Sequence, residues 1–337
     1  MIRPIAESDT VSPDRCASWS HYWSSGVLHS CAGSFRGNYD GAIASFWHES
    51  FDTLELQHRV LDVASGNGAL PRLLLGLDGG SDRGCSIDAI DLAALAPGWL
   101  TELDDAQNAR LRLHSGVMAE RLPFADATFD LVISQYGIEY ADLAVALSEA
   151  ARVLRAQGRL RLVMHHADAV PVRKGAVEAR LIEDLLGSSG LFVCAGSMLP
   201  WIALAATADG RVQLHGNAKA NGDRAAFNAC QLRIDAAMAG AGDDADVLHE
   251  ARDQVQQIFA LAQTEGLQRA NIGLQALRQS YAEHLLRVRE LVAHALDSAH
   301  MAEVMRQLDG LGFSLVSATP LNYEAHLMGW MVRADRG

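Results

Sequence analysis

The stretch that decides the fold is Val-Leu-Asp-Val-Ala-Ser-Gly-Asn-Gly, residues 60–68. A β-branched apolar run ends in an acid, a glycine-rich turn follows, and leucines then recur at helical spacing from Leu70 to Leu77. The order strand, tight turn, helix predicts the first unit of an open α/β sheet, whose ligands bind at the carboxyl ends of the strands. Gly66 and Gly68 allow close backbone approach, and a helix N-terminus there favours a carboxylate. Asp62 could hold a ligand ammonium group.

The spacing of this turn disfavours a dinucleotide. A dinucleotide site needs glycine at the first, third and sixth positions of the turn. Counted from Gly66, the third position is Gly68 but the sixth is Pro71. Proline suits the first turn of a helix but does not give the close helix–strand packing that glycine gives. NAD is therefore disfavoured.

Two further runs predict strands of the same sheet. Residues 85–91 predict a strand that again ends in an acid, Asp91, where a carboxylate would accept hydrogen bonds from two ribose hydroxyls. Residues 122–134 predict a loop, a turn and then a buried strand from Phe129 to Ser134.

Together these segments resemble a class I S-adenosylmethionine (SAM)-dependent methyltransferase, near the ubiquinone/menaquinone C-methyltransferase-like branch (methyltransferase type 11). The resemblance covers about residues 55–166, in which four motifs follow in order. It implies a Rossmann-like α/β sheet of seven strands with the last one antiparallel. It also implies SAM as cofactor and S-adenosylhomocysteine as product.

The resemblance implies cofactor contacts at the ends of four strands. The residues around the methionine part are Asp62, Ala64, Ser65, Gly66, Asn67 and Gly68. Asp91 would bind the ribose, and Leu92 would lie against the adenine. The adenine edge would face Met118 and Ala119, and the sulfonium would lie over Ser134, Gln135 and Tyr136.

Two positions depart from the family's pattern. Ala64 stands where the family usually has glycine, which is a mild change if the backbone φ there is negative. Met118 stands where the family usually has an aspartate that accepts from the adenine amino group. A thioether is a weak acceptor, so adenine recognition should depend on the Ala119 backbone and on apolar packing.

Composition excludes several classes of protein. The chain has 337 residues, 49% of them hydrophobic, and a net charge of −13, which argues against a nucleic-acid partner. Its five cysteines are scattered, as expected for free thiols in a reducing cytoplasm. The N-terminus has no apolar signal core, and no run of about 18 apolar residues occurs. We therefore expect a cytoplasmic protein without a membrane span.

The chain divides into three parts. Residues 1–55 contain eight aromatic residues and are expected to form a helical lid. We expect the SAM-binding core to comprise residues 56–166 and 300–337. Residues 167–299 are expected to form a helical insertion between strands five and six. Inserted helices after strand five would form a substrate cap, and their apolar faces could equally support a homodimer. Residues 312–319 and 326–333 predict the last two strands, joined by a turn near Pro320–Asn322.

Four residues are candidates for catalysis. His165 and His166 end strand five, and because side chains alternate on a strand, only one should face the cleft as a base. The alternative is a histidine that caps a carbonyl group. Glu139 and Tyr140 follow strand four and could orient or deprotonate a hydroxyl, or Glu139 caps the next helix. Adjacent histidines on a strand diverge, so no metal site is expected.

The aromatic segment suggests the substrate. Tyr22, Trp23 and Tyr39 could stack on a planar acceptor, or this segment could simply pack against the sheet. The predicted function is methylation of a small aromatic or apolar metabolite on oxygen or carbon. One alternative is a protein or peptide methyltransferase. The other is a catalytically silent SAM-fold scaffold whose insertion binds a partner, and the residue type at Met118 is the feature that supports it.

Overall fold

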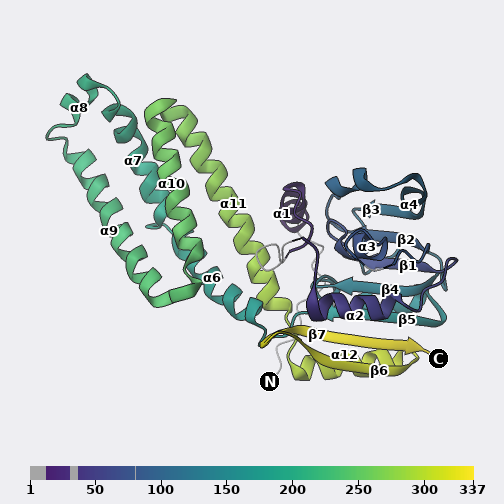
Figure 1. Ribbon diagram of the computed structural model, residues 1–337. Helices are drawn as coiled ribbons and strands as arrows, with labels where there is room; N and C mark the ends of the chain where they lie inside the picture. Colours follow the sequence, from purple (N-terminus) through teal and green to yellow (C-terminus); the bar gives the residue numbers. More distant parts are fainter. Residues whose placement is uncertain (1–12, 31–36, 80) are drawn as a thin grey trace. The chain divides into compact units, whose positions relative to one another are not determined.

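The computed structural model describes residues 13–30, 37–79 and 81–337 (Figure 1). It separates into two compact units. The α/β unit runs to Val172 and resumes at Glu290, and the helical unit is Arg173–Arg289. Cys31 and Phe35, which belong to the thiols and the aromatic segment noted above, lie outside the described residues. The described cysteines, Cys16, Cys85, Cys194 and Cys230, are all free.

The α/β unit contains a seven-stranded sheet in the order β3-β2-β1-β4-β5-β7-β6 (Figure 1). The strands are β1 (Arg59–Val63), β2 (Ser86–Asp91), β3 (Leu111–Ser115), β4 (Phe129–Gln135), β5 (Leu154–Met164), β6 (Phe313–Tyr323) and β7 (His326–Arg336). β1 to β5 are parallel, and β7 runs antiparallel between β5 and β6. The predicted Rossmann-like sheet with an antiparallel last strand is confirmed.

The final hairpin differs from the sequence prediction. β6 continues through Pro320, which pairs with Trp330, and ends at Tyr323, so the turn lies at residues 324–325. Glu324 adopts a positive φ of 53° there. Pro320 is tolerated within the strand because β6 is the edge of the sheet, where a missing N–H costs no ladder bond.

Helices cover both faces of the sheet. Side chains of α2 (Gly41–Phe51) and α3 (Ala69–Leu74) form one core with Val60 of β1. Side chains of α5 (Leu143–Val153) and α12 (Ser298–Gly310) form the other with Leu61. Neighbouring residues of one strand thus enter opposite cores, as the two-residue period of a strand requires. The remaining short elements are η1 (Gly98–Glu102), α4 (Asp105–Arg110) and η2 (Ile138–Tyr140).

The helical unit is built from α6 (Val170–Leu186), α7 (Leu191–Ala205), α8 (Ala208–Leu214), α9 (Ala218–Ala241), α10 (Asp246–Thr264) and α11 (Leu267–His294), with η3 (Gly242–Asp244) as a link. α7 packs against both α9 and α10, and the buried apolar residues form a core of their own (Figure 1). The first residues of α6 and the last of α11 belong to the α/β unit. The Ala/Gly-rich stretch 209–222 is mostly helical because Thr207 and Asn217 cap α8 and α9.

One described segment, Val170–Ala205, is apolar and long enough to cross a membrane by length and composition. The structure interrupts it at residues 187–190, between α6 and α7. Core helices of soluble proteins pass the same test, so one such segment is weak evidence. The absence of a membrane span stays a prediction.

Candidate functional site

A glycine loop joins β1 to α3 at the carboxyl edge of the sheet. Gly66 has φ +51° and Gly68 has φ +78°, both in the left-handed region that suits glycine. A Cβ on Gly66 would lie 2.5 Å from the Trp23 ring, so only glycine fits there. Asp91, at the end of β2, accepts the Gly66 amide at 2.8 Å through Oδ2 and the Ala93 amide at 2.8 Å through Oδ1. The carboxylate thereby holds the loop against β2.

Ala64 opens this loop in a strained conformation. Its φ is +56°, so the substitution of the usual glycine is not the mild change expected for a negative φ. Alanine in the left-handed region costs about 1–2 kcal/mol. Gly137 lies beside it, since a Cβ on Gly137 would come within 2.5 Å of the Ala64 methyl group.

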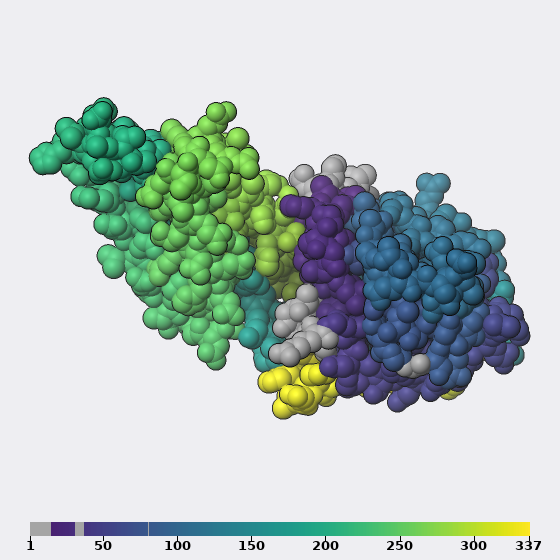
Figure 2. Space-filling view, turned by 45° about the horizontal axis from the view of Figure 1, so that its top comes forward, coloured from purple at the N-terminus to yellow at the C-terminus, as the bar shows by residue number. Residues whose placement is uncertain are grey.

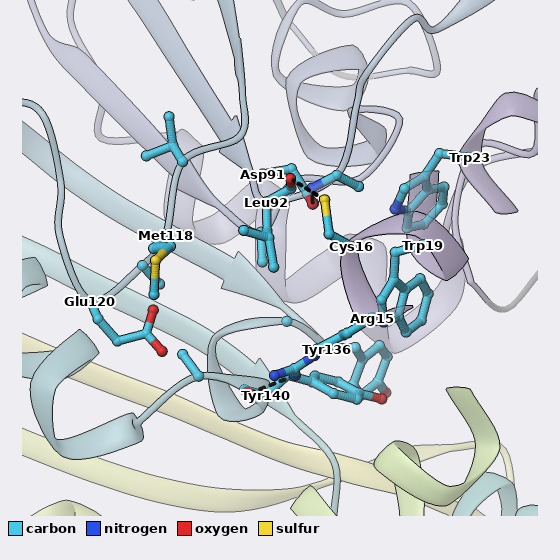
Figure 3. Close-up of a pocket in the computed structure, with 16 residues that line it drawn as sticks. Arg15, Cys16, Trp19, Trp23, Asp91, Leu92, Met118, Glu120, Tyr136 and Tyr140 are labelled. Carbon is cyan, nitrogen blue, oxygen red and sulfur yellow. Dashed lines mark hydrogen bonds between the residues drawn. The ribbon is translucent and has the colours of Figure 1, made fainter. Parts of the chain in front are cut away.

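Two adjoining pockets open above the loop. The first, the apolar pocket, has a volume of about 100 Å³ (Figure 3). It is lined by Arg15, Cys16, Trp19, Trp23, Ala64, Asp91, Leu92, Ala93, Val117, Met118, Ala119, Glu120, Tyr136, Gly137, Tyr140 and Ala141. The second, the polar pocket, has a volume of about 40 Å³. It is lined by Trp19, Trp23, Leu28, His29, Ser30, Tyr39, Asp62, Ala64, Ser65, Gly66, Ala69, Leu70, Gln135 and Tyr136. Four lining residues are common to both, so the pockets are halves of one crevice.

The polar pocket contains buried groups that lack partners. Asp62 is 1% exposed, and neither oxygen of its carboxylate has a hydrogen-bond partner in the described chain. Burial raises the pKa of Asp62 well above its usual value, and the nearby Asp91 raises it further. Gln135 accepts from the Trp47 indole through Oε1, while its Nε2 has no partner in the same part of the structure. A buried polar group without a partner is costly, which indicates that a ligand completes both.

The two halves fit the two ends of a sulfonium nucleoside. A carboxylate and an amide donor at the polar pocket match the ammonium and carboxylate of an amino acid. Leu92, Val117 and Met118 give the apolar pocket a surface suited to a planar base, and the Asp91 carboxylate lines the same pocket. The residues present therefore fit SAM.

The helix α1 (Pro13–Ser24) contributes one face of this crevice. Arg15, Trp19 and Trp23 follow at spacings of four residues and all line it. The Asn67 amide donates to the Trp23 and Val27 carbonyls at 2.8 and 2.7 Å, which ties the end of α1 to the glycine loop. Figure 2 shows this N-terminal segment, in purple, lying against the blue part of the α/β unit.

The start of α1 is held by a partly buried acid, Glu290. Glu290 forms an ion pair with Arg15 at 2.8 Å and accepts from the Trp19 indole at 3.1 Å. Burial raises the pKa of Glu290. Arg15 also donates to the Tyr140 carbonyl at 2.6 Å, and the Cys16 thiol donates to the Leu92 carbonyl at 3.4 Å.

Comparison with known proteins agrees with this geometry. Residues 61–162 match the family described as "Methyltransferase domain". This part of the chain is a class I SAM-dependent methyltransferase domain. Similar curated proteins include the ubiquinone/menaquinone biosynthesis C-methyltransferase UbiE of Saccharophagus degradans, 31% identical over 41% of this chain and 57% of that protein. The malonyl-(acyl-carrier protein) O-methyltransferase of Enterobacter lignolyticus is 34% identical over 36% of this chain and 44% of its own length.

Among solved structures, a putative methyltransferase of Bacillus halodurans is 25% identical with a TM-score of 0.31, covering 41% of this chain and 58% of that one. The chain spans about half the length of the curated relatives it matches. SAM is the cofactor of such domains.

Most residues expected to bind SAM line the crevice of the methyltransferase domain. They are Asp62, Ala64, Ser65, Gly66, Gln135 and Tyr136 at the polar pocket, and Asp91, Leu92, Met118 and Ala119 at the apolar pocket. Three others lie outside the lining. Asn67 ties down α1, Gly68 packs on Trp99, and Ser134 donates to the Val63 carbonyl at 2.7 Å and accepts from the Ile138 amide. These three residues support the loop.

The catalytic candidates divide in the same way. Tyr140 lines the apolar pocket, whereas Glu139, His165 and His166 line neither pocket. His165 donates to Glu139 Oε1 through its backbone amide at 2.9 Å, and its Nδ1 lies 2.8 Å from the same oxygen. Its ring lies against Tyr136, with centroids 4.3 Å apart. β5 ends at Met164, so both histidines follow the strand rather than end it, and the His166 ring stacks on Trp330.

The substrate candidates are partly brought together. Trp23 lines both pockets, and Tyr39 lines the polar one beside His29, on which it stacks. Tyr22 lines neither and packs edge-on against Trp23. Four further residues line the pockets but are not predicted from the sequence: Arg15, Cys16, His29 and Glu120. Of these, Arg15 could have been predicted, because it precedes Trp19 and Trp23 at four-residue spacing on one helix face. No cluster suited to a metal occurs among the described residues.

Proposed function

We propose that the whole protein transfers the methyl group of SAM to a small acceptor. The observation that carries the proposal is the pairing, in one crevice, of an apolar nucleoside pocket with unpartnered Asp62 and Gln135 groups. When bound, SAM would supply a methyl group on a positively charged sulfur, so that a nucleophile in line with the carbon–sulfur bond takes the methyl group and S-adenosylhomocysteine leaves as the neutral thioether. The chain's own contribution would be to align the two reactants, which supplies most of the acceleration of such reactions.

The N-terminal helix α1 is proposed as a lid over the cofactor. Its tryptophans face both halves of the crevice, and its bonds to Asn67, Leu92 and Glu290 hold it in place. Closing this face would exclude water from the transferring methyl group. The helical insertion is proposed as the substrate cap, within the boundaries 167–299.

The acceptor is proposed to be a small aromatic or apolar metabolite, methylated on oxygen or carbon. The support is the aromatic lining by Trp19, Trp23, Tyr39 and Tyr136, together with the similarity to a quinone-pathway C-methyltransferase. The similarity to an O-methyltransferase of malonyl-acyl-carrier protein keeps a protein-borne acceptor as the second candidate.

We also propose that the protein is cytoplasmic.

Glu139 and His165 are proposed as a positioning pair. Glu139 is fully buried and orients the His165 ring, which supports Tyr136 at the crevice wall. His165→Ala should then lower kcat by a larger factor than it lowers the affinity for SAM. A change in affinity with kcat unchanged would contradict this role, and unchanged turnover of both His165→Ala and His166→Ala would exclude either histidine from the reaction.

A homodimer through the helical unit is also proposed. Val212, Leu232 and Ile272 are 75%, 70% and 53% exposed on that unit. Light scattering of the full chain tests this proposal, and a monomer at high micromolar concentration would exclude it.

Calorimetric titration with SAM and S-adenosylhomocysteine tests the proposed function. We expect both to bind at micromolar concentrations, and methylated product to form when extracts rich in aromatic metabolites supply the acceptor. If neither nucleoside binds at high micromolar concentration, the proposed function is wrong and a catalytically silent scaffold is favoured.

A further inference from the structure

One acidic side chain of the apolar pocket has no part in the account so far. Met118 and Glu120 both line the end of this pocket that lies away from Asp91 (Figure 3). Met118 is 38% exposed, and its thioether is a weak acceptor. The Met118 end of the apolar pocket therefore has no good acceptor for an amino group in the Met118 side chain itself.

Glu120 offers the missing acceptor. Its Oε1 accepts the backbone amide of Asp142 at 2.9 Å, which holds the carboxylate beside the pocket. No hydrogen bond among the described residues uses Oε2. The other charged groups of the lining are engaged, because Arg15 pairs with Glu290 and Asp91 holds the loop amides of Gly66 and Ala93.

We propose that Glu120 accepts a hydrogen bond from the exocyclic amino group of adenine and so selects adenine over 6-oxo purines. This inference rests on the proposed function, since it assumes that the apolar pocket binds the nucleoside of SAM. A carboxylate accepts from the adenine amine but repels the carbonyl oxygen that replaces it in hypoxanthine. The backbone of Ala119 alone would give weaker discrimination.

The test compares S-adenosylhomocysteine with its 6-oxo analogue, S-inosylhomocysteine, by calorimetry. The wild-type chain should prefer the adenine compound by tenfold or more, as expected for a hydrogen bond to a charged group. Glu120→Gln should reduce that preference about tenfold, because an amide can donate to the 6-oxo group as well as accept. It keeps an oxygen for the Asp142 amide, so the loop should stay folded.

Two further variants sharpen the test. Met118→Asp in the Glu120→Ala background should restore the adenine preference. Glu149→Gln is the matched control, because Glu149 accepts a loop amide, that of Leu122 at 2.9 Å, outside either pocket; its preference should equal wild type.

Each outcome decides between the hypotheses. An unchanged preference in Glu120→Gln would overturn the role of Glu120, and so would an equal loss for both compounds, which would mean that Glu120 only supports the loop. Failure of wild type to bind S-adenosylhomocysteine at all would instead overturn the proposed function.

Discussion

The polar and apolar halves of the crevice each contain a buried aspartate, but within the described residues only the aspartate of the apolar half has hydrogen-bond partners for its carboxylate oxygens. In the polar half, Asp62 is buried without a partner and its pKa is raised by burial. In the apolar half, Asp91 is also buried, but backbone amides partner both of its oxygens. Burial raises the pKa of Asp91 too, while the amides of Ala93 and Gly66 lower it.

This difference shows what each half contributes. The apolar half is largely complete before any ligand arrives, so it presents a formed surface to the nucleoside that we propose it binds. The polar half is left with unpaired groups, so the protein itself is destabilised there until a cation and an acceptor enter. Recognition of the amino-acid end should therefore depend directly on Asp62 and Gln135, whereas a change at Asp91 should also disturb the loop that its carboxylate holds.

The largest effect is expected for Asp91→Ala. The change removes the proposed ribose acceptor and leaves the amides of Gly66 and Ala93 without their partner, each at a cost of about 1–3 kcal/mol. Affinity for S-adenosylhomocysteine should fall by about 100-fold or more in a calorimetric titration. Binding equal to wild type would remove Asp91 from the cofactor site.

A smaller effect is expected at the contacts that hold α1. Glu290→Gln weakens the bonds to Arg15 and Trp19, so S-adenosylhomocysteine should dissociate about tenfold faster, equivalent to about 1.4 kcal/mol. Stopped-flow tryptophan fluorescence measures the rate. Glu303→Gln, which loses only an exposed ion pair with Arg306 on α12, is the control. Equal rates in all three proteins would show that α1 does not limit release.

The pH dependence of stability should report on the buried Asp62 of the polar half. Because the folded pKa of Asp62 is raised, the folded state binds its proton more tightly than the unfolded chain, and stability falls as pH rises from the usual value of 3.8 through the raised pKa. Asp62→Asn should remove part of this fall and be more stable than the ligand-free wild type at pH 7. Urea unfolding from pH 4 to 8 measures it, and parallel curves for both proteins would contradict the burial argument.

The smallest effect is expected for Ala64→Gly. Glycine has no penalty at φ +56°, so the change should stabilise the ligand-free protein by about 1 kcal/mol. Thermal unfolding tests it, with Ala302→Gly, at an exposed position inside helix α12, as a control that should destabilise by a similar amount. Destabilisation by Ala64→Gly would mean that the methyl contact with Gly137 outweighs the strain.

Much of this site follows from sequence because strand ends converge. The run before Asp62, the acid at Asp91 and the segment ending at Gln135 lie at the carboxyl ends of adjacent parallel strands, so spacing alone brought them together. The sequence could not place residues whose positions depend on tertiary contacts. His165 contacts Glu139 and Tyr136 behind the crevice wall, and the Ser134 hydroxyl forms hydrogen bonds with two backbone groups.

The backbone of Ala64 and the end of β6 were also beyond sequence reasoning. A positive φ at alanine arises from the loop geometry around Gly66 and Gly137, which the residue type alone would not indicate. Pro320 reads as a turn residue, and only its place on the edge strand allows β6 to continue past it.

The most direct measurement titrates wild type and Asp62→Asn with two ligands, S-adenosylhomocysteine and 5′-methylthioadenosine, which lacks the amino-acid end. The account predicts that the variant loses about tenfold or more in affinity for S-adenosylhomocysteine, as for one hydrogen bond to a charged group, and keeps its affinity for methylthioadenosine within about twofold. An equal loss for both ligands, or no loss for either, would contradict the division of the crevice into an amino-acid half and a nucleoside half.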